Sequence, residues 1–128
     1  MQTISTVYQL KKGEKVQVLS DRNLLANTNP ERNTQFMGWL LKTSELGIVF
    51  GGDFNKNHHT TGTVTYSNTY QNLGNGLNIA DGSFTAPVSG IYYFHFQGLT
   101  DTEDSNLISI KLNGKTVAST FRNKRKVK

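Results

Sequence analysis

The sequence predicts an all-β domain, built as a sandwich or a barrel-like jelly roll of short strands. Apolar and polar residues alternate at period two along much of the chain, as in strands with one buried face. Twelve glycines and only two prolines, with abundant Thr and Asn, are typical of many tight turns between strands. A chain of 128 residues is long enough for one domain with a single sizeable core.

Alternation predicts the first two strands. Apolar and polar residues alternate from Ile4 to Leu10, and Lys12-Gly13 marks the turn that follows. Val16 and Val18 share one face of the next strand, which ends at Ser20-Asp21. We therefore expect an N-terminal pair of strands joined by a short turn.

The next stretch contains a loop and an ambiguous segment. Residues 27–34 are polar, contain Pro30 and indicate a loop. Four residues between Phe36 and Thr43 fall at roughly helical spacing, but the segment has no convincing cap and contains Gly38. We therefore expect a strand there.

Two further strands follow from residues that share a face. Val64 and Tyr66 lie two apart, as do Tyr92, Phe94 and Phe96. The second set predicts a strand with an aromatic inward face. His95 then points outward or toward a neighbouring subunit.

The clearest hairpin spans residues 107–120. Ile108 and Ile110 point one way along its first strand. Asn113-Gly114 supplies two residues that tolerate positive φ, as a type I′ turn requires. Residues 116–120 form the returning strand.

Composition and motifs exclude several classes of protein. The absence of cysteine excludes a disulfide scaffold, a thiolate zinc site and a cysteine nucleophile. No apolar run reaches about 18 residues, so no membrane span is expected. Residues 1–5 lack the basic and apolar regions of a signal peptide. Phosphate-binding, serine-hydrolase and zinc-protease motifs are absent, so we expect neither enzymatic activity nor a cofactor.

A pattern of fixed spacing runs from residue 66 to residue 96. It consists of an aromatic residue, Asn or Asp, an aromatic residue or Leu, Phe, and then Gly-x-aromatic-x-Phe-x-aromatic. Its positions hold Tyr66, Asn72, Leu77, Phe84, Gly90, Tyr92, Phe94 and Phe96. The pattern resembles the signature of the C1q-like globular domain, although Phe is more usual at the first position.

The resemblance implies a jelly-roll β-sandwich of about ten strands, of the kind shared with tumour necrosis factor, that assembles as a homotrimer. It also implies that six residues are structural and pack the core or the subunits: Tyr66, Phe84, Gly90, Tyr92, Phe94 and Phe96. Gly90 is expected where the backbone needs a special angle or a close approach.

The last two strands of the usual family order resemble segments at the beginning of this sequence. Residues 10–16 (LKKGEKV) resemble the family pattern Leu-x-x-Gly-Asp-x-Val, with Glu14 in place of Asp. Residues 36–40 (FMGWL) resemble Phe-x-Gly-aromatic-Leu, and residues 49–52 (VFGG) resemble the opening strand. The order of these segments indicates a circularly permuted domain.

In this interpretation residues 1–128 form a single C1q-like domain. Residues 1–41 correspond to the family's C-terminal strands, residues 42–47 form the joint, and residues 48–128 correspond to its N-terminal part. The first and last strands of the family fold are neighbours, so the joint is expected to be a surface hairpin loop. A natural permutation, an engineered permutation and a fragment that spans two tandem domains are the alternative origins.

Metal sites have weak candidates. Asp101, Glu103 and Asp104 could ligate calcium, but they lack an alternating series of ligands and also suit a solvated loop. His58 and His59 could offer imidazole nitrogens, but adjacent residues of an extended run point to opposite faces. Calcium in the family uses acidic residues after the Asn-Gly hairpin, where this sequence is basic, so we do not expect it here.

The basic residues of the last segment are candidates for binding an anionic ligand: Arg122, Lys124, Arg125, Lys126 and Lys128. The rest of the chain carries as many acidic as basic residues. Three copies near a threefold axis would focus positive potential. Phosphate contacts are an alternative, but no aromatic residue interleaves to stack bases, so nucleic acid is not an expected partner. A solvated loop is the third interpretation.

The resemblance implies a non-enzymatic trimeric recognition module for protein, glycan or other surface ligands. It implies a secreted setting, such as innate immunity, and lectin-like binding. A trimerising scaffold without its own ligand site is the alternative function.

Overall fold

The computed structural model describes residues 2–22, 24–25, 34–41, 47–53, 61–100 and 105–123. All the regular elements of these residues are strands, which follow from the period-two alternation of the sequence. They are β1 (Gln2–Leu10), β2 (Lys15–Ser20), β3 (Leu24–Leu25), β4 (Gln35–Leu40), β5 (Val49–Asp53), β6 (Gly62–Thr63), β7 (Asn68–Leu73), β8 (Leu77–Asn78), β9 (Ser83–Thr85), β10 (Gly90–Thr100), β11 (Asn106–Leu112) and β12 (Lys115–Arg122).

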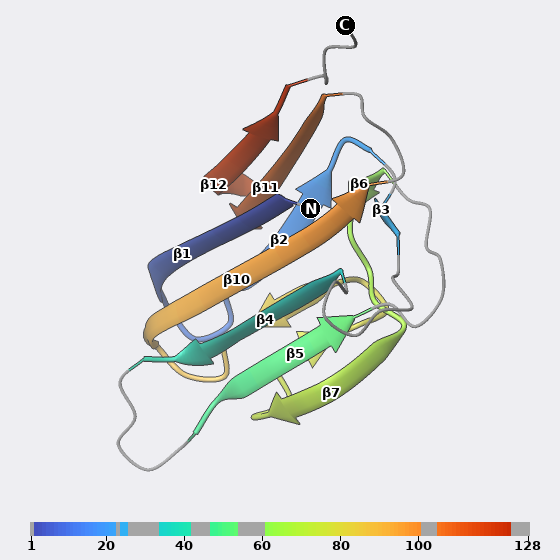
Figure 1. The fold of residues 1–128 in the computed structure, drawn as a ribbon. Helices are drawn as coiled ribbons and strands as arrows, with labels where there is room; N and C mark the ends of the chain where they lie inside the picture. The colour runs from blue at the N-terminus through green and yellow to red at the C-terminus, as the bar shows by residue number, and fades with distance from the viewer. Residues whose placement is uncertain are drawn as a thin grey trace, which may run out of the picture.

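The strands form two antiparallel sheets. The first sheet has the order β1-β10-β4-β5-β7, which Figure 1 shows side by side, and β3 pairs with β10 at one end. The second sheet has the order β12-β11-β2-β9-β8, and β6 pairs with β2. This arrangement confirms the predicted all-β jelly-roll sandwich. The described residues contain twelve strands, rather than about ten, because β3, β6 and β8 are two-residue pairings.

The core lies between the sheets and is rich in aromatic rings. Tyr92, Phe94 and Phe96 all point inward from β10, as the alternation predicted. Phe50 of the first sheet stacks on Phe84 of the second, with 4.2 Å between ring centroids. Aromatic pairs at such distances add to the free energy gained by burial, so these rings hold the two layers together.

The sequence predicted a strand through Val64 and Tyr66, and this prediction is wrong about which residues form the strand. Only Gly62 and Thr63 form a strand, although both predicted residues are buried. The N–H of Val64 donates to Val18 O at 2.7 Å, while that of Tyr66 donates to Ile79 O at 3.0 Å. Because these two amides bond to different segments, the chain is tied in place without a continuous ladder.

The turn at Asn113-Gly114 has the predicted geometry, with φ of 48° and 84°. Asn113 also holds a second turn in place. Its Oδ1 accepts the N–H of Lys15 at 3.0 Å, and its Nδ2 donates to Glu14 Oε2 at 3.2 Å. The other carboxylate oxygen of Glu14 accepts the N–H of Lys11 at 2.7 Å. The turn between β1 and β2 is thus fixed against the β11–β12 hairpin.

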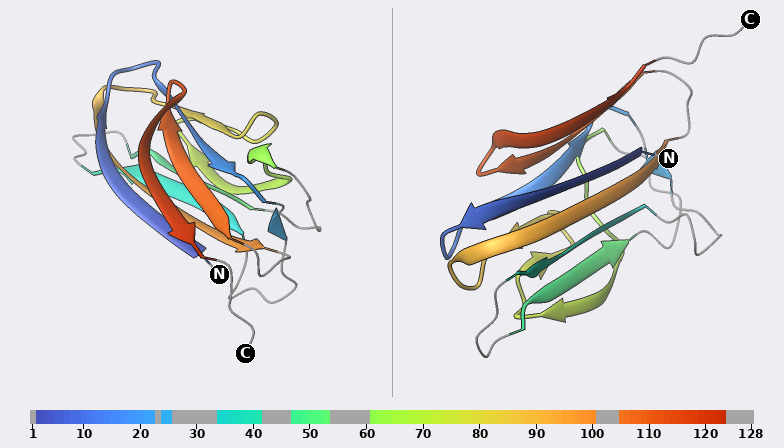
Figure 2. Two further views of the ribbon diagram at one scale, coloured as in Figure 1. Left: turned by 90° about the horizontal axis from the view of Figure 1, so that it is seen from above. Right: turned by 60° about the vertical axis from the view of Figure 1, so that its left-hand side comes forward.

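A polar bridge ties the two sheets together where β1 begins. Asn106 Nδ2 donates to Gln2 Oε1 at 2.7 Å, and Gln2 Nε2 donates to the carbonyls of Asn106 and Thr120, both at 3.2 Å. Gln2 and Asn106 are buried, so these bonds satisfy groups that would otherwise be costly. The start of β1 therefore lies beside the end of β12, as the left view of Figure 2 shows.

Candidate functional site

An apolar row crosses the outer face of the first sheet. The pairing register aligns five residues, one from each strand: Val7, Tyr93, Trp39, Val49 and Leu73. Val7 is 52% exposed, Trp39 39% and Leu73 57%. The rings of Trp39 and Tyr93 contact each other with centroids 4.5 Å apart.

The row is extended by Ile91 and Leu41, which are also exposed. Leu41 N–H donates to Ile91 O at 2.8 Å, so these two residues lie side by side at one end of β10 and β4. Contiguous apolar side chains of this kind on a soluble domain mark interaction surfaces. We call these seven residues the apolar row.

Hydrogen-bonded polar side chains lie beside the apolar row. Ser5 Oγ is 2.7 Å from His95 Nδ1, and the hydroxyl of Tyr93 donates to Ser5 Oγ at 3.2 Å. A Ser–His contact is also found in hydrolases, but there a third group orients the imidazole. No carboxylate contacts His95 among the residues that the structure describes. The arrangement suits hydrogen bonding at an interface.

Tyr70 lies at the far edge of the same sheet, where a register shift occurs between β5 and β7 at Gly51 and Gly52. Its ring occupies the space in which a side chain at residue 51 would lie. Its hydroxyl donates to Gln35 Oε1 at 3.3 Å. Burial raises the pKa of Tyr70, and the nearby carboxylate of Asp53 raises it further, so the phenol is neutral.

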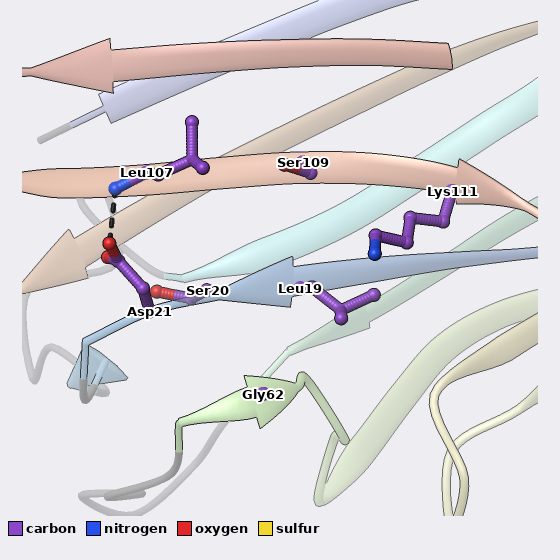
Figure 3. Close-up of a pocket in the computed structure, with 7 residues that line it drawn as sticks. All are labelled: Leu19, Ser20, Asp21, Gly62, Leu107, Ser109 and Lys111. Atoms are coloured by element: carbon purple, nitrogen blue, oxygen red, sulfur yellow. Dashed lines mark hydrogen bonds between the residues drawn. The ribbon is translucent and has the colours of Figure 1, made fainter. Parts of the chain in front are cut away.

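A groove of about 350 Å³ lies on the outer face of the second sheet (Figure 3). We call it the outer groove. It is lined by Leu19, Ser20, Asp21, Gly62, Leu107, Ser109 and Lys111. The residues come from β2, β6 and β11 and from the turn after β2, and most of the exposed surface is apolar. Asp21 Oδ1 accepts the N–H of Leu107 at 2.8 Å at one end, and Lys111 lies at the other.

The six residues expected to be structural lie inside or against the core. Phe84, Tyr92, Phe94 and Phe96 are fully buried, and Tyr66 nearly so. Burial raises the pKa of Tyr66 well above its usual value. At Gly90 a Cβ atom would lie 2.6 Å from Leu40 Cδ1, so this glycine permits a close approach rather than a left-handed backbone angle.

Of the other predicted ligand residues, the structure describes only Arg122. Arg122 is the last residue of β12, opposite Asn106. The remaining candidates lie outside the described residues: Lys124, Arg125, Lys126 and Lys128 for anions, and Asp101, Glu103, Asp104, His58 and His59 for metals. Within the described ranges, no three His, Asp or Glu side chains gather as a metal site.

The carboxyl group of Asp81, in the turn before β9, has a shifted pKa with a structural cause. The hydroxyl of Ser83 donates to Asp81 Oδ1 at 2.6 Å and lowers the pKa of that carboxyl group. Stability from this contact is therefore present above the ordinary pKa of Asp81 and is lost as the pH falls through the lowered value. The contact belongs to the turn before β9.

The two antiparallel sheets, the strand order and the aromatic core define a jelly-roll module of the C1q and tumour necrosis factor type. The model of the C1q domain family matches residues 50–128, so the chain belongs to the C1q domain family. Comparison with curated proteins and with solved structures gives no match. Members of this family are generally non-enzymatic, typically form trimers and are commonly extracellular. No helix among the described residues is long and apolar enough to cross a membrane.

Proposed function

We propose that the protein is a non-enzymatic, homotrimeric recognition module that binds protein, glycan or other surface ligands in an extracellular setting. The observation that carries this proposal is the apolar row on the outer face of the first sheet. A monomer would leave Val7, Trp39 and Leu73 in water, whereas a closed threefold assembly would cover them. Membership in the C1q domain family supports the same assembly.

The alternative is a trimerising scaffold without a ligand site of its own. Both functions predict a trimer, so oligomeric state does not separate them. A ligand array does, because a specific and saturable hit supports recognition, whereas uniform silence supports the scaffold. The outer groove favours recognition, since it offers a second surface that the apolar row does not use.

Replacing Trp39 with lysine should break the trimer. The native protein should have a mass near three times 14.3 kDa, and Trp39→Lys should approach a single 14.3 kDa chain at the same concentration. The physical reason is that three buried ammonium groups without partners would oppose assembly. Light scattering on a size-exclusion column measures the mass, and a circular-dichroism melt verifies that the variant is folded.

The matched control for this test is Phe121→Lys. Phe121 is 58% exposed, more than Trp39, but it lies on β12 of the second sheet. The same change of charge should leave the mass unchanged there. A native protein that is monomeric, or a loss of assembly in the control alone, would contradict the proposed interface.

We also propose that the domain is circularly permuted, with the boundaries given above. The family match begins at residue 50, yet earlier strands are integral to both sheets. β4 lies inside the first sheet, β2 lies inside the second, and β1 forms an edge of the first. β4 and β5 pair as antiparallel neighbours, as the first and last strands of the family order should. The contacts of Gln2 with Asn106 and Thr120 likewise support β12 and β1 as consecutive strands in that order.

The joint should accept insertions. Two flexible residues placed between Thr43 and Leu46 should change the free energy of unfolding by less than about 1 kcal/mol, because lengthening a surface loop costs little entropy. Urea denaturation measures this quantity. The same insertion between Gly38 and Trp39 serves as the control, since it breaks a strand paired on both sides and should abolish folding. Equal effects at the two places would argue against a loop at residues 42–47.

A further inference from the structure

The outer groove contains two polar groups that lack partners. Ser109 is only 7% exposed, and its hydroxyl has no hydrogen-bond partner among the described residues. Lys111 lies two residues along β11, on the same face, and no carboxylate within the described ranges pairs with it. The Ser109 hydroxyl is not among the fully buried side-chain atoms that lack a partner, so it is open to the groove and available to donate to a ligand there.

The geometry of β11 brings these donors together. Ile108 and Ile110 point into the core, so the alternating residues Leu107, Ser109 and Lys111 point into the groove. Residues two apart on a strand are about 7 Å apart, which lets a long lysine side chain reach the space above Ser109. Figure 3 shows the Lys111 side chain extending toward β2, beside Leu19. The Ser109 hydroxyl and the Lys111 ammonium group thus lie on the same face of β11, with Lys111 at the end of the groove away from Asp21.

The remainder of the groove is suited to an apolar chain. Leu19 and Leu107 form walls on β2 and β11, and Gly62 of β6 leaves room opposite them. Asp21 lies at the end away from Lys111 and is fixed by the N–H of Leu107. Its negative charge would repel a second anionic group at that end.

We propose that the outer groove binds a monocarboxylate that carries an apolar chain. The carboxylate accepts hydrogen bonds from Ser109 Oγ and Lys111 Nζ, and the chain lies along Leu19 and Leu107 toward Asp21. Charge complementarity fixes this orientation, and Asp21 selects against a dicarboxylate. The inference rests on the proposed recognition function and gives it a ligand class, but it needs only one protomer and does not depend on the trimer.

Octanoate is the test ligand, used below the concentration at which it self-associates. Titration into ¹⁵N-labelled protein should shift the amide signals of Leu19, Leu107 and Ser109 saturably. Octanoate should bind about tenfold more tightly than 1-octanol, as expected for one charge-assisted hydrogen bond. Octanedioate, which has a carboxylate at each end, should bind more weakly than octanoate.

Variants assign the effect to individual residues. Lys111→Gln should weaken octanoate binding about tenfold and leave 1-octanol binding unchanged. Ser109→Ala should weaken octanoate binding about threefold, as for a neutral hydrogen bond. Lys115→Gln is the matched control, because Lys115 is an exposed lysine of the neighbouring β12 that does not line the groove. It should bind octanoate like the native protein.

Several results would overturn the inference. These are equal affinity for octanoate and 1-octanol, signal shifts confined to the first sheet, unchanged binding by Lys111→Gln, or binding to anionic vesicles without binding to octanoate. The mass of the same samples separates this test from the previous one. A monomer that binds octanoate refutes the trimer alone, and a trimer that does not bind it refutes the groove ligand alone.

Discussion

Phe94→Ala should lower the free energy of unfolding by about 3–5 kcal/mol, measured by urea denaturation at one protein concentration. Phe94 is fully buried in the middle of β10, and its ring lies near those of Phe36, Phe84 and Tyr92. Truncation removes the apolar surface and leaves a cavity, because rings held from both sheets cannot collapse into the space.

Two variants keep this measurement interpretable. Phe94→Leu preserves most of the volume and should cost about 1–2 kcal/mol, so it reports on packing even if the alanine variant does not fold. Phe121→Ala removes an equally large ring from an exposed site and should cost about 0.5 kcal/mol or less. A loss under about 0.5 kcal/mol for Phe94→Ala would contradict the inward placement of the aromatic face of β10.

The features that the sequence predicted best are those set by neighbouring residues. Alternation at Tyr92, Phe94 and Phe96 gives the inward face of β10 without knowledge of its partners. The positive φ angles of Asn113 and Gly114 are similarly local, because few other residues tolerate them. At Val64 and Tyr66, however, the partners decide the structure, since their amides bond to two different segments.

The candidate surfaces depend on register between distant parts of the chain. Alternation turns Leu107, Ser109 and Lys111 outward once Ile108 and Ile110 face the core. Only the pairing of Ser109 with Leu19 places an apolar wall beside them. The Ser5–His95 contact likewise depends on the β1–β10 register. The family resemblance orders the strands, but the pairings between distant segments are set by the register of the folded sheets.

The two surfaces point away from each other, because they lie on the outer faces of the two layers. The apolar row uses β1, β10, β4, β5 and β7, whereas the outer groove uses β2, β6 and β11. Covering the first in a trimer would leave the second open in every protomer. Three grooves would then act together on a surface that displays several monocarboxylate chains, and the avidity would depend on the spacing of those chains.

Gly82→Ala should be among the most damaging single substitutions, costing about 3 kcal/mol or more. Gly82 has a φ of 73°, in the left-handed region, and a Cβ atom there would overlap the carbonyl oxygen of Val64. That carbonyl cannot move freely, because the N–H of Val64 is bonded to Val18 O of β2. The substitution must therefore displace the backbone that ties this crossing segment to the second sheet.

Gly13→Ala is the matched control for this prediction. Gly13 also has a positive φ, of 92°, but a Cβ atom there would have no other heavy atom within 4 Å, so only the left-handed conformation is penalised. That penalty is about 1–2 kcal/mol. Urea denaturation of both variants separates the two costs, since the excess loss in Gly82→Ala measures the overlap with Val64. Equal losses would mean that the segment from Val64 to Tyr66 can move aside without a further loss of stability. Burial of its side chains, rather than its hydrogen bonds, would then hold it between the sheets.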